Sequence, residues 1–316
     1  MLDSVITTHY KFQKLLKYLE NSRTIHLTGL TGAARSFFVS KIIKNVKRPI
    51  LLVTPDISTA LKYTREIRIF SSKKTSFLPS QEASPYEQVY SDPEITKQQL
   101  IILKDQPEVI VTPAKNLLNT YLPKQKANDN SVKLGLKAKA DPFDTAQKLT
   151  EIGYKRVTTV IDPGEFSLCG DILDIYPISG DPVRVEFFCD EVESLRLFNI
   201  DSQRSIRKIT SIIIEPRYKI VINNEEKESL LKKLSQMPHS PYIENFIARF
   251  EADTYTEGIE YLAPLLNDNL SDVFDYLQKN TLVFMHESAE ILQRLHIQDE
   301  IYIHEYEKNI NECLSP

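Results

Sequence analysis

Three continuous apolar runs, each leading into residues with helical spacing, dominate the first third of the chain. The runs are TIHLTG (24–29), RPILLVTP (48–55) and PEVIVTP (107–113), and a helical pattern such as that of residues 57–70 follows each one. Continuous apolar strands that alternate with helices are typical of a parallel sheet covered by helices. The pattern therefore predicts an α/β fold for this part of the chain.

The pattern changes after residue 122. Residues 123–140 are polar and rich in lysine, which predicts a linker or an exposed crossing. A short helix is predicted over 141–154. Short strands are then predicted in DILDIYP (171–177), VRVEFF (183–188), SLRLFNI (194–200) and ITSIIIEP (209–216). Short strands separated by short turns indicate an antiparallel sheet.

Helical spacing returns after Pro216. Two helices are predicted over 225–237 and 240–252, and TLVFMHES (281–288) predicts one more buried strand before a final helix. The β-rich part therefore interrupts a chain that is otherwise of the α/β type.

At 316 residues the chain is long for a single core, so more than one structural unit is expected. We predict that residues 1–125 and 217–316 form the two segments of one α/β domain. Residues 126–216 then form an inserted, antiparallel, β-rich α+β domain.

Composition narrows the class of protein. The hydrophobic fraction of 41% and the charged fraction of 26% are those of a soluble globular protein. No apolar stretch is long enough to span a bilayer, and the first residues lack the pattern of a secretory signal. The three cysteines, Cys169, Cys189 and Cys313, include no Cys-x-x-Cys pair, which argues against a disulfide framework. We expect a cytoplasmic protein with no membrane contact.

The net charge of −4 conceals an uneven distribution. Residues 1–140 contain 22 Lys and Arg against 11 Asp and Glu, whereas residues 218–316 contain 8 against 18. A basic first segment attracts phosphates, so weak DNA contact by residues 1–140 is one interpretation. The simpler interpretation is that the basic and acidic parts attract one another within the fold, because the lysines are scattered.

The segment GLTGAARS (29–36) lies where a phosphate-binding P-loop would lie, between an apolar run and a helical run. A P-loop reads G-x-x-x-x-G-K-[ST], because its glycines turn backbone N–H groups onto phosphates and its lysine reaches them. Gly29, Gly32 and Ser36 fit this degenerate nucleotide loop. Ala34 replaces the second glycine, and Arg35 replaces the lysine with a larger, planar cation.

A nucleotide hydrolase also needs an Asp at the end of a buried strand to hold Mg²⁺. The corresponding strand here ends in VFMHES, with His286 at the Asp position and Glu287 beside it. We therefore expect no nucleotide cofactor, no metal and no enzymatic activity. The two glycines then form a tight strand-to-helix turn. Weak binding of an anion at the helix N-terminus stays an alternative.

The order of these motifs resembles the N-terminal module of the bacterial transcription-repair coupling factor (Mfd), which is itself similar to UvrB. GLTGAARS and FMHESA occupy the places of two UvrB motifs that read like G-V-T-G-S-G-K-T and F-I-D-E-S-H. The longest matching segment is VRVEFFCDEVESLRLFNIDSQRS (183–205), and GDILDIYP (170–177) also matches. The resemblance covers nearly the whole chain.

The resemblance implies two segments of a degenerate RecA-like P-loop domain with an inserted β-rich domain that binds UvrA. It places the UvrA contact on Arg184 and Phe188. A second arginine of the family stands where this chain has Cys169. Phe187 and Phe188 point to opposite sides of their strand, so one of them lies on the exposed face. The alternative is that Phe188 belongs to the core.

The implied function is a non-catalytic recruitment module of transcription-coupled nucleotide excision repair. Full-length members of the family are ATP-dependent DNA translocases that contact RNA polymerase and DNA through domains that these 316 residues do not contain. One alternative is an active UvrB-like DNA-dependent ATPase or damaged-DNA-binding protein. It would need an aromatic-rich hairpin, for which the stretch 84–100 is too short. A purely structural scaffold is the other alternative.

Overall fold

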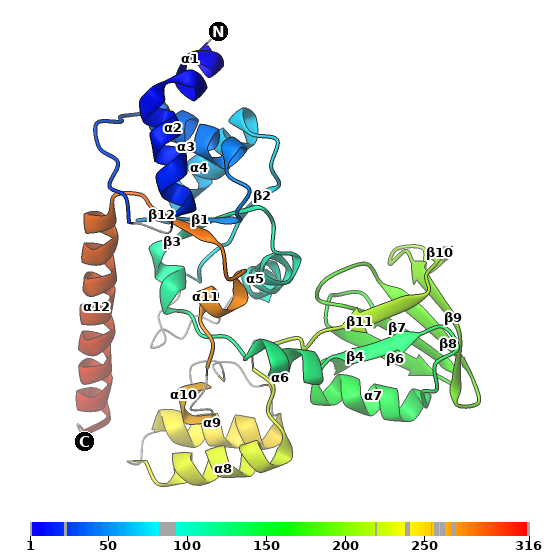
Figure 1. The fold of residues 1–316 in the computed structure, drawn as a ribbon. Coiled ribbons are helices and arrows are strands. Elements are labelled where there is room, and N and C mark those ends of the chain that lie inside the picture. The colour runs from blue at the N-terminus through cyan, green and yellow to red at the C-terminus, as the bar shows by residue number, and fades with distance from the viewer. Residues whose placement is uncertain are drawn as a thin grey trace. The chain divides into compact units, whose positions relative to one another are not determined.

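The computed structural model divides into two compact units, which are described separately below (Figure 1). The first unit comprises residues 1–82, 102–119 and 277–301, and the second comprises residues 83–101, 120–276 and 302–316. The structure describes residues 2–21, 24–81, 93–218, 220–237, 241–253, 255, 259, 263–266 and 270–314.

A four-stranded parallel sheet forms the centre of the first unit. Its strands follow the order β12 (Leu282–Met285), β1 (Ile50–Thr54), β3 (Val109–Pro113) and β2 (Thr75–Phe77). Every residue of β1 and β3 is buried, as expected for a parallel sheet whose inner strands are covered on both faces. The parallel sheet predicted from the apolar runs is confirmed.

Helices α2 (Tyr10–Glu20), α3 (Ala33–Asn45) and α4 (Ile57–Phe70) pack on one face of this sheet. Ile50 and Leu52 of β1 belong to the core on that face, together with side chains of α3 and α4. Asp56 begins α4 as its N-cap, because its carboxylate accepts the backbone N–H of Thr59 at 2.7 Å.

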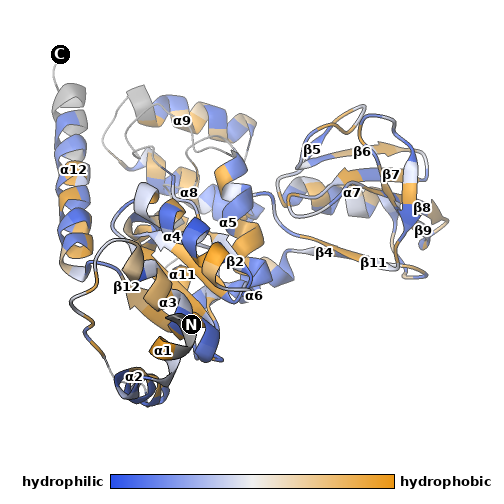
Figure 2. Cartoon of the chain, turned by 90° about the horizontal axis from the view of Figure 1, so that it is seen from above, coloured by the Kyte–Doolittle hydropathy of each residue, from blue (hydrophilic) through white to orange (hydrophobic). Residues whose placement is uncertain are grey.

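Helix α1 (Leu2–Thr8) and the 3₁₀ helix η1 (Ala114–Leu118) also belong to the first unit. Helix α5 (Pro93–Asp105) and helix α12 (Ser288–Leu314) each have residues in both units. The hydrophobic colour gathers on the strands, whereas α12 carries both colours along its length (Figure 2). The prediction of a strand over 24–29 is wrong, because residues 24–28 have no regular secondary structure. An apolar run alone did not distinguish a strand from a connection that leads into a glycine turn.

A six-stranded sheet dominates the second unit. Its strands follow the order β10 (Ser205–Lys208), β9 (Glu191–Phe198), β8 (Val183–Phe188), β7 (Ile172–Tyr176), β6 (Glu165–Cys169) and β5 (Lys155–Arg156). All neighbours are antiparallel except β5 and β6, which are parallel. The predicted antiparallel, β-rich region is confirmed.

Helix α7 (Pro142–Glu151) covers one face of this sheet, and no helix among the described residues covers the other face (Figure 1). Asp141 caps α7 through hydrogen bonds from two backbone N–H groups, and Pro142 occupies its first turn. The core between the helix and the sheet contains Leu149, Leu173, Val183 and Val185.

The prediction of a linker over 123–140 is wrong. Helix α6 (Lys124–Asp129) and strand β4 (Val132–Gly135) occupy this segment, and β4 pairs with β11 (Ser211–Ile214) in a two-stranded antiparallel ribbon. Val132 and Leu134 are buried in the core of the six-stranded sheet. The many lysines hid this short alternation of buried and exposed positions.

Helices α8 (Asn224–Ser235), α9 (Pro241–Ala252), α10 (Ala263–Leu266) and α11 (Val273–Tyr276) follow. Asn223 and Glu226 form a capping box at the start of α8. Leu230 of α8 and Phe250 of α9 lie at the centre of the apolar core between these helices. Over the described residues, no helix is both long enough and apolar enough to cross a membrane.

The two faces of β7 allow a paired stability test. Leu173→Ala is expected to lower the free energy of unfolding by about 2–5 kcal/mol, because Leu173 is fully buried and its loss leaves a cavity. Ile172→Ala, next to it on the exposed face, is expected to change that free energy by less than about 1 kcal/mol. Urea denaturation measures both, and equal effects would contradict the assignment of the two faces.

Candidate functional site

Strand β8 presents one set of side chains to the core and another to the open face of the six-stranded sheet. Val183, Val185 and Phe187 are buried, whereas Arg184, Glu186 and Phe188 lie on the open face. This follows from the period of two residues in a β-strand. The expectation that Phe187 and Phe188 point to opposite sides is confirmed, and Phe188 is 69% exposed.

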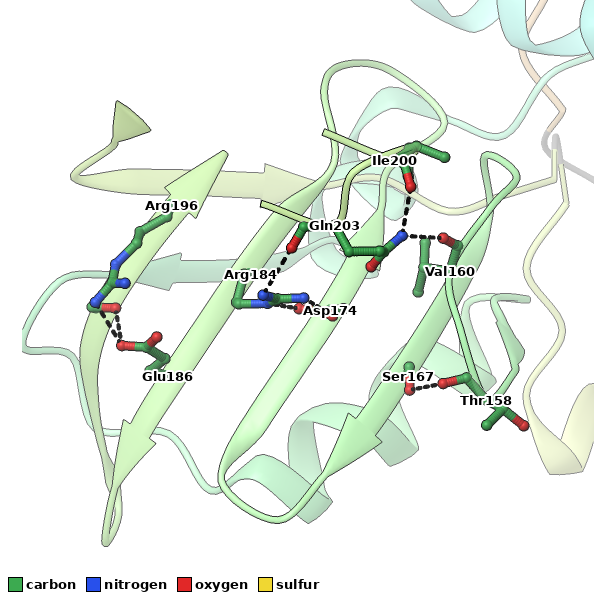
Figure 3. Close-up of polar contacts among 10 residues, drawn as sticks. Thr158, Val160, Ser167, Asp174, Arg184, Glu186, Arg196, Ile200 and Gln203 are labelled. Atoms are coloured by element: carbon green, nitrogen blue, oxygen red, sulfur yellow. Dashed lines mark hydrogen bonds and ion pairs between the residues drawn. The ribbon is translucent and has the colours of Figure 1, made fainter. Parts of the chain in front are cut away.

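Arg184 is held by a bidentate ion pair on this face. Its Nε and Nη2 atoms each donate to a carboxylate oxygen of Asp174 on β7 at 2.7 Å (Figure 3). Cross-strand register explains the pair, because Asp174 and Arg184 lie directly opposite each other. Its Nη1 atom donates to the Gln203 carbonyl at 3.3 Å, and its guanidinium lies 5.1 Å from the ring centre of Phe198.

The hydrogen bonds to Asp174 raise the pKa of the Arg184 guanidinium above its ordinary value. A planar guanidinium with two parallel bonds to one carboxylate has little freedom to reorient. Arg184 is therefore a fixed part of the open face and a support for Asp174.

A second ion pair lies beside the first. Arg196 of β9 contacts the Glu186 carboxylate at 2.9 Å, and the Ser194 hydroxyl donates to the same carboxylate at 2.7 Å. Both pairs join neighbouring strands across the open face (Figure 3). The four charges thus neutralise one another in pairs, so this central part of the face has no net charge.

The end of the open face near the hairpin turns is more apolar. Phe188 lies two positions beyond Glu186 on β8, and Ile172 of β7 pairs with Glu186. Cys169 of β6 pairs in turn with Ile172, and Cys169 is a free, exposed cysteine. Exposed apolar side chains thus gather where the family resemblance would place an arginine at position 169.

Loops at the opposite end are tied to the sheet by hydrogen bonds. The Gln203 amide donates to the carbonyls of Ile200 and Val160, at 2.8 and 3.3 Å, and the Ser167 hydroxyl donates to the Thr158 carbonyl (Figure 3). These bonds link the β9–β10 turn to the segment before β6. This end of the open face is therefore supported by hydrogen bonds from side chains to backbone carbonyls.

Comparison with known proteins finds a family similarity for the β-rich part of the chain. Residues 132–219 match the family described as the UvrB interaction domain. The chain is 29% identical to the transcription-repair-coupling factor of Bacillus subtilis over 287 residues, which are 84% of this chain and 24% of that protein. It is also 29% identical to the factor of Escherichia coli over 265 residues, which are 80% of this chain and 23% of that protein.

Residues 132–219 are thus similar to the UvrB interaction domain, and most of the chain is similar to the transcription-repair-coupling factors. The resemblance expected from the sequence motifs is thus confirmed. The chain spans about a quarter of the length of these relatives. The matched segment begins at β4 and ends beyond β11, so it contains the whole six-stranded sheet and α7.

The six-stranded sheet brings Arg184 and Phe188 onto one face, as the alternation along 183–188 indicates. Sequence reasoning missed Asp174, Glu186 and Arg196. The same alternation could have placed Glu186 beside Arg184. The partners Asp174 and Arg196 depend on the register between strands, for which the sequence carries no local signal.

The segment predicted to be a degenerate nucleotide loop (29–36) lies in the other unit, and its predicted residues do come together. Gly29 and Gly32 have positive φ values of 86° and 55°, which glycine adopts readily. The Arg35 guanidinium contacts the Glu287 carboxylate at 2.7 Å and donates to the Leu30 carbonyl at 2.7 Å. The predicted loop and the predicted end of β12 are thus joined by an ion pair.

His286, at the expected position of a metal-holding Asp, contacts Tyr63 of α4. The Tyr63 hydroxyl and His286 Nδ1 are 3.0 Å apart. Burial first, and the positive charge of Arg35 second, lower the pKa of His286 below its ordinary value of 6.5. Burial also raises the pKa of Tyr63 to about 12. Among the described residues, no three His, Cys, Asp or Glu side chains are grouped so as to hold a metal.

The Asp174–Arg184 pair is expected to stabilise the six-stranded sheet and its core. Asp174→Asn should lower the free energy of unfolding by about 1–3 kcal/mol, because it leaves a half-buried guanidinium with a weakened partner. Glu193→Gln, at an exposed position of β9, is the matched control and should have little effect. Chemical denaturation checks both variants, and equal stability of Asp174→Asn and the unaltered chain would refute the structural role.

His286 should make stability depend on pH. Its pKa is lower in the folded chain than in the unfolded chain, so the unfolded state binds the proton more readily. Stability is therefore expected to fall as the pH decreases below about 6.5. His286→Gln, which keeps a polar partner for Tyr63, should remove this component. Melting temperatures between pH 5 and 8 test it, and parallel curves for the two proteins would contradict it.

Proposed function

We propose that the chain is a non-catalytic recruitment module of transcription-coupled nucleotide excision repair that docks UvrA to a coupling factor at stalled RNA polymerase. The observation that carries this proposal is the match of residues 132–219 to the UvrB interaction domain. The open face of the six-stranded sheet is the proposed docking surface, with Phe188 as its anchor.

Phe188 has the properties of an interface anchor. It is a large aromatic side chain that is 69% exposed, whereas its neighbour Phe187 is buried. Burying such a side chain against a partner contributes about 1.5–3 kcal/mol. Aromatic residues are enriched at the centres of protein interfaces. Ile172 lies on the same face and extends the apolar contact.

Arg184 supports the docking surface in a second way. Its ion pair with Asp174 presents both side chains in a fixed geometry, so a partner meets a preorganised polar group. Cys169 replaces a cation with a small thiol. We propose that the partner's contact at this corner is apolar here, in place of a charge-assisted hydrogen bond.

We further propose that residues 1–125 and 217–316 form a degenerate RecA-like P-loop domain without a nucleotide cofactor or enzymatic activity. The substitution of lysine by Arg35 and of the metal-holding Asp by His286 supports this. Contacts with RNA polymerase and DNA are proposed for the parts of the longer relatives that this chain does not span. Weak DNA contact by the basic residues 1–140 stays a prediction.

The UvrB-like alternative has no specific support among the described residues. It would require a hairpin within 84–100, of which residues 84–92 lie outside the described residues. It would also require a functional cation at position 35, and Arg35 is paired with Glu287.

Phe188→Ala provides the direct test of docking. It is expected to weaken binding to UvrA from the same organism by at least about tenfold, because the anchor is lost. The stability of the chain should not change, because the side chain is exposed. Isothermal titration calorimetry without nucleotide measures the binding.

Phe143→Ala is the matched control for this experiment. Phe143 is 68% exposed, but it lies on α7, which covers the opposite face of the sheet. Its replacement should leave UvrA binding unchanged. Equal losses in both variants, or no binding by the unaltered chain, would refute docking through the open face.

A further inference from the structure

We propose that the GLTGAARS loop (29–36) is a self-occupied anion site, in which the chain's own carboxylates, Glu287 and Glu66, hold the groups that a phosphate ligand would need. The loop thus excludes phosphate-bearing ligands by an internal electrostatic contact. This inference concerns the first unit alone and does not depend on the binding of UvrA.

The cation of the loop, Arg35, already has a partner within the chain. Arg35 contacts the Glu287 carboxylate through Nη1 at 2.7 Å and the Leu30 carbonyl through Nε at 2.7 Å. In a P-loop the residue at this position reaches the β- and γ-phosphates. Here the guanidinium instead binds a carboxylate from the β12–α12 junction and folds back onto its own loop.

The hydroxyl of the loop is occupied in the same way. Ser36 is buried, and its hydroxyl donates to the carboxylate of Glu66 on α4. In a P-loop the corresponding hydroxyl binds Mg²⁺. Two carboxylates from different elements, α4 and the β12–α12 junction, therefore converge on the first turn of α3.

The backbone N–H groups of the loop are also used internally. Those of Ala34 and Arg35 each donate at 3.2 Å, to the carbonyls of Thr31 and Gly32 respectively. A phosphate-binding loop directs such groups at its ligand. The N-terminus of α3 has no side-chain cap and no acidic residue in its first turn. Glu287 and Glu66 are then the anions that complement this end of the helix dipole.

The two glycines are not packed against other atoms, because a Cβ atom added at Gly29 or Gly32 would meet no other atom within 4 Å. The proposed obstacle to a phosphate is charge. A phosphate entering the loop would have to replace Glu287 as the partner of Arg35. It would also be repelled at short range by the carboxylates of Glu287 and Glu66.

The backbone of Glu287 supports this reading. Its φ of 54° lies in the left-handed region, which a residue with a side chain adopts at a cost. The turn at this residue brings its carboxylate to Arg35. Burial is the main cause of the raised pKa of Tyr63, and the charges of Arg35, Glu66 and Glu287 also act on that pKa.

The test is anion binding by the full chain with the two carboxylates neutralised. Glu66→Gln/Glu287→Gln is expected to bind pyrophosphate at least about tenfold more tightly than the unaltered chain, as measured by calorimetry. Adding Arg35→Ala to this variant should abolish the gain, because the cation is then absent. Glu287→Gln alone, at an exposed side chain, is expected to show a smaller gain and guards against a folding defect caused by altering Glu66.

Glu290→Gln is the matched control. It removes one negative charge from the first turn of α12, but Glu290 pairs with Arg294 and not with Arg35. It should leave pyrophosphate binding unchanged. The proposal is overturned if the unaltered chain binds pyrophosphate as tightly as the double variant, if neither neutralised variant gains affinity, or if Glu290→Gln gains as much.

Discussion

The opposite orientation of successive side chains along β8 is the constraint on which the proposed docking surface depends. A core on one side of the six-stranded sheet requires Val183, Val185 and Phe187 to point inward. The residues between them must then lie on the other face, which no helix in the described part of the chain covers (Figure 1). Because the run ends in two phenylalanines, the strand cannot bury both. Phe188 is thus exposed as a consequence of how its neighbours are buried.

Paired charges give both regions of interest their rigidity. On the open face, the Asp174–Arg184 and Glu186–Arg196 pairs join three neighbouring strands and leave no net charge among them. At the glycine loop, the pair between Arg35 and Glu287 joins the start of α3 to the end of β12. In each case an arginine that the sequence suggests as a contact for a ligand or partner is held by a carboxylate of the same chain. Substituting either arginine therefore also disturbs the structure.

Much of the fold could be predicted from the apolar pattern, for identifiable reasons. Strands β1 and β3 are continuous apolar runs, and their burial on both faces makes them easy to recognise. The short β2, β5 and β10 were not predicted, because strands of two to four residues contain too few positions to establish a period. The run at 24–29 was wrongly predicted as a strand, and β4 was hidden among lysines. Local pattern was thus informative where an element was long or fully buried.

The sequence by itself determined the resemblance to the coupling factors, the two kinds of sheet, the pairing of one buried with one exposed phenylalanine, and the loss of the lysine from the glycine loop. These depend on residue identity and on periods within one element. The tertiary structure alone decided that Asp174 holds Arg184, that Glu287 holds Arg35 and that Glu66 holds Ser36. Each of these contacts joins residues from different elements. Strand register and helix packing bring such residues together, and neither is encoded in the spacing of residues along one segment.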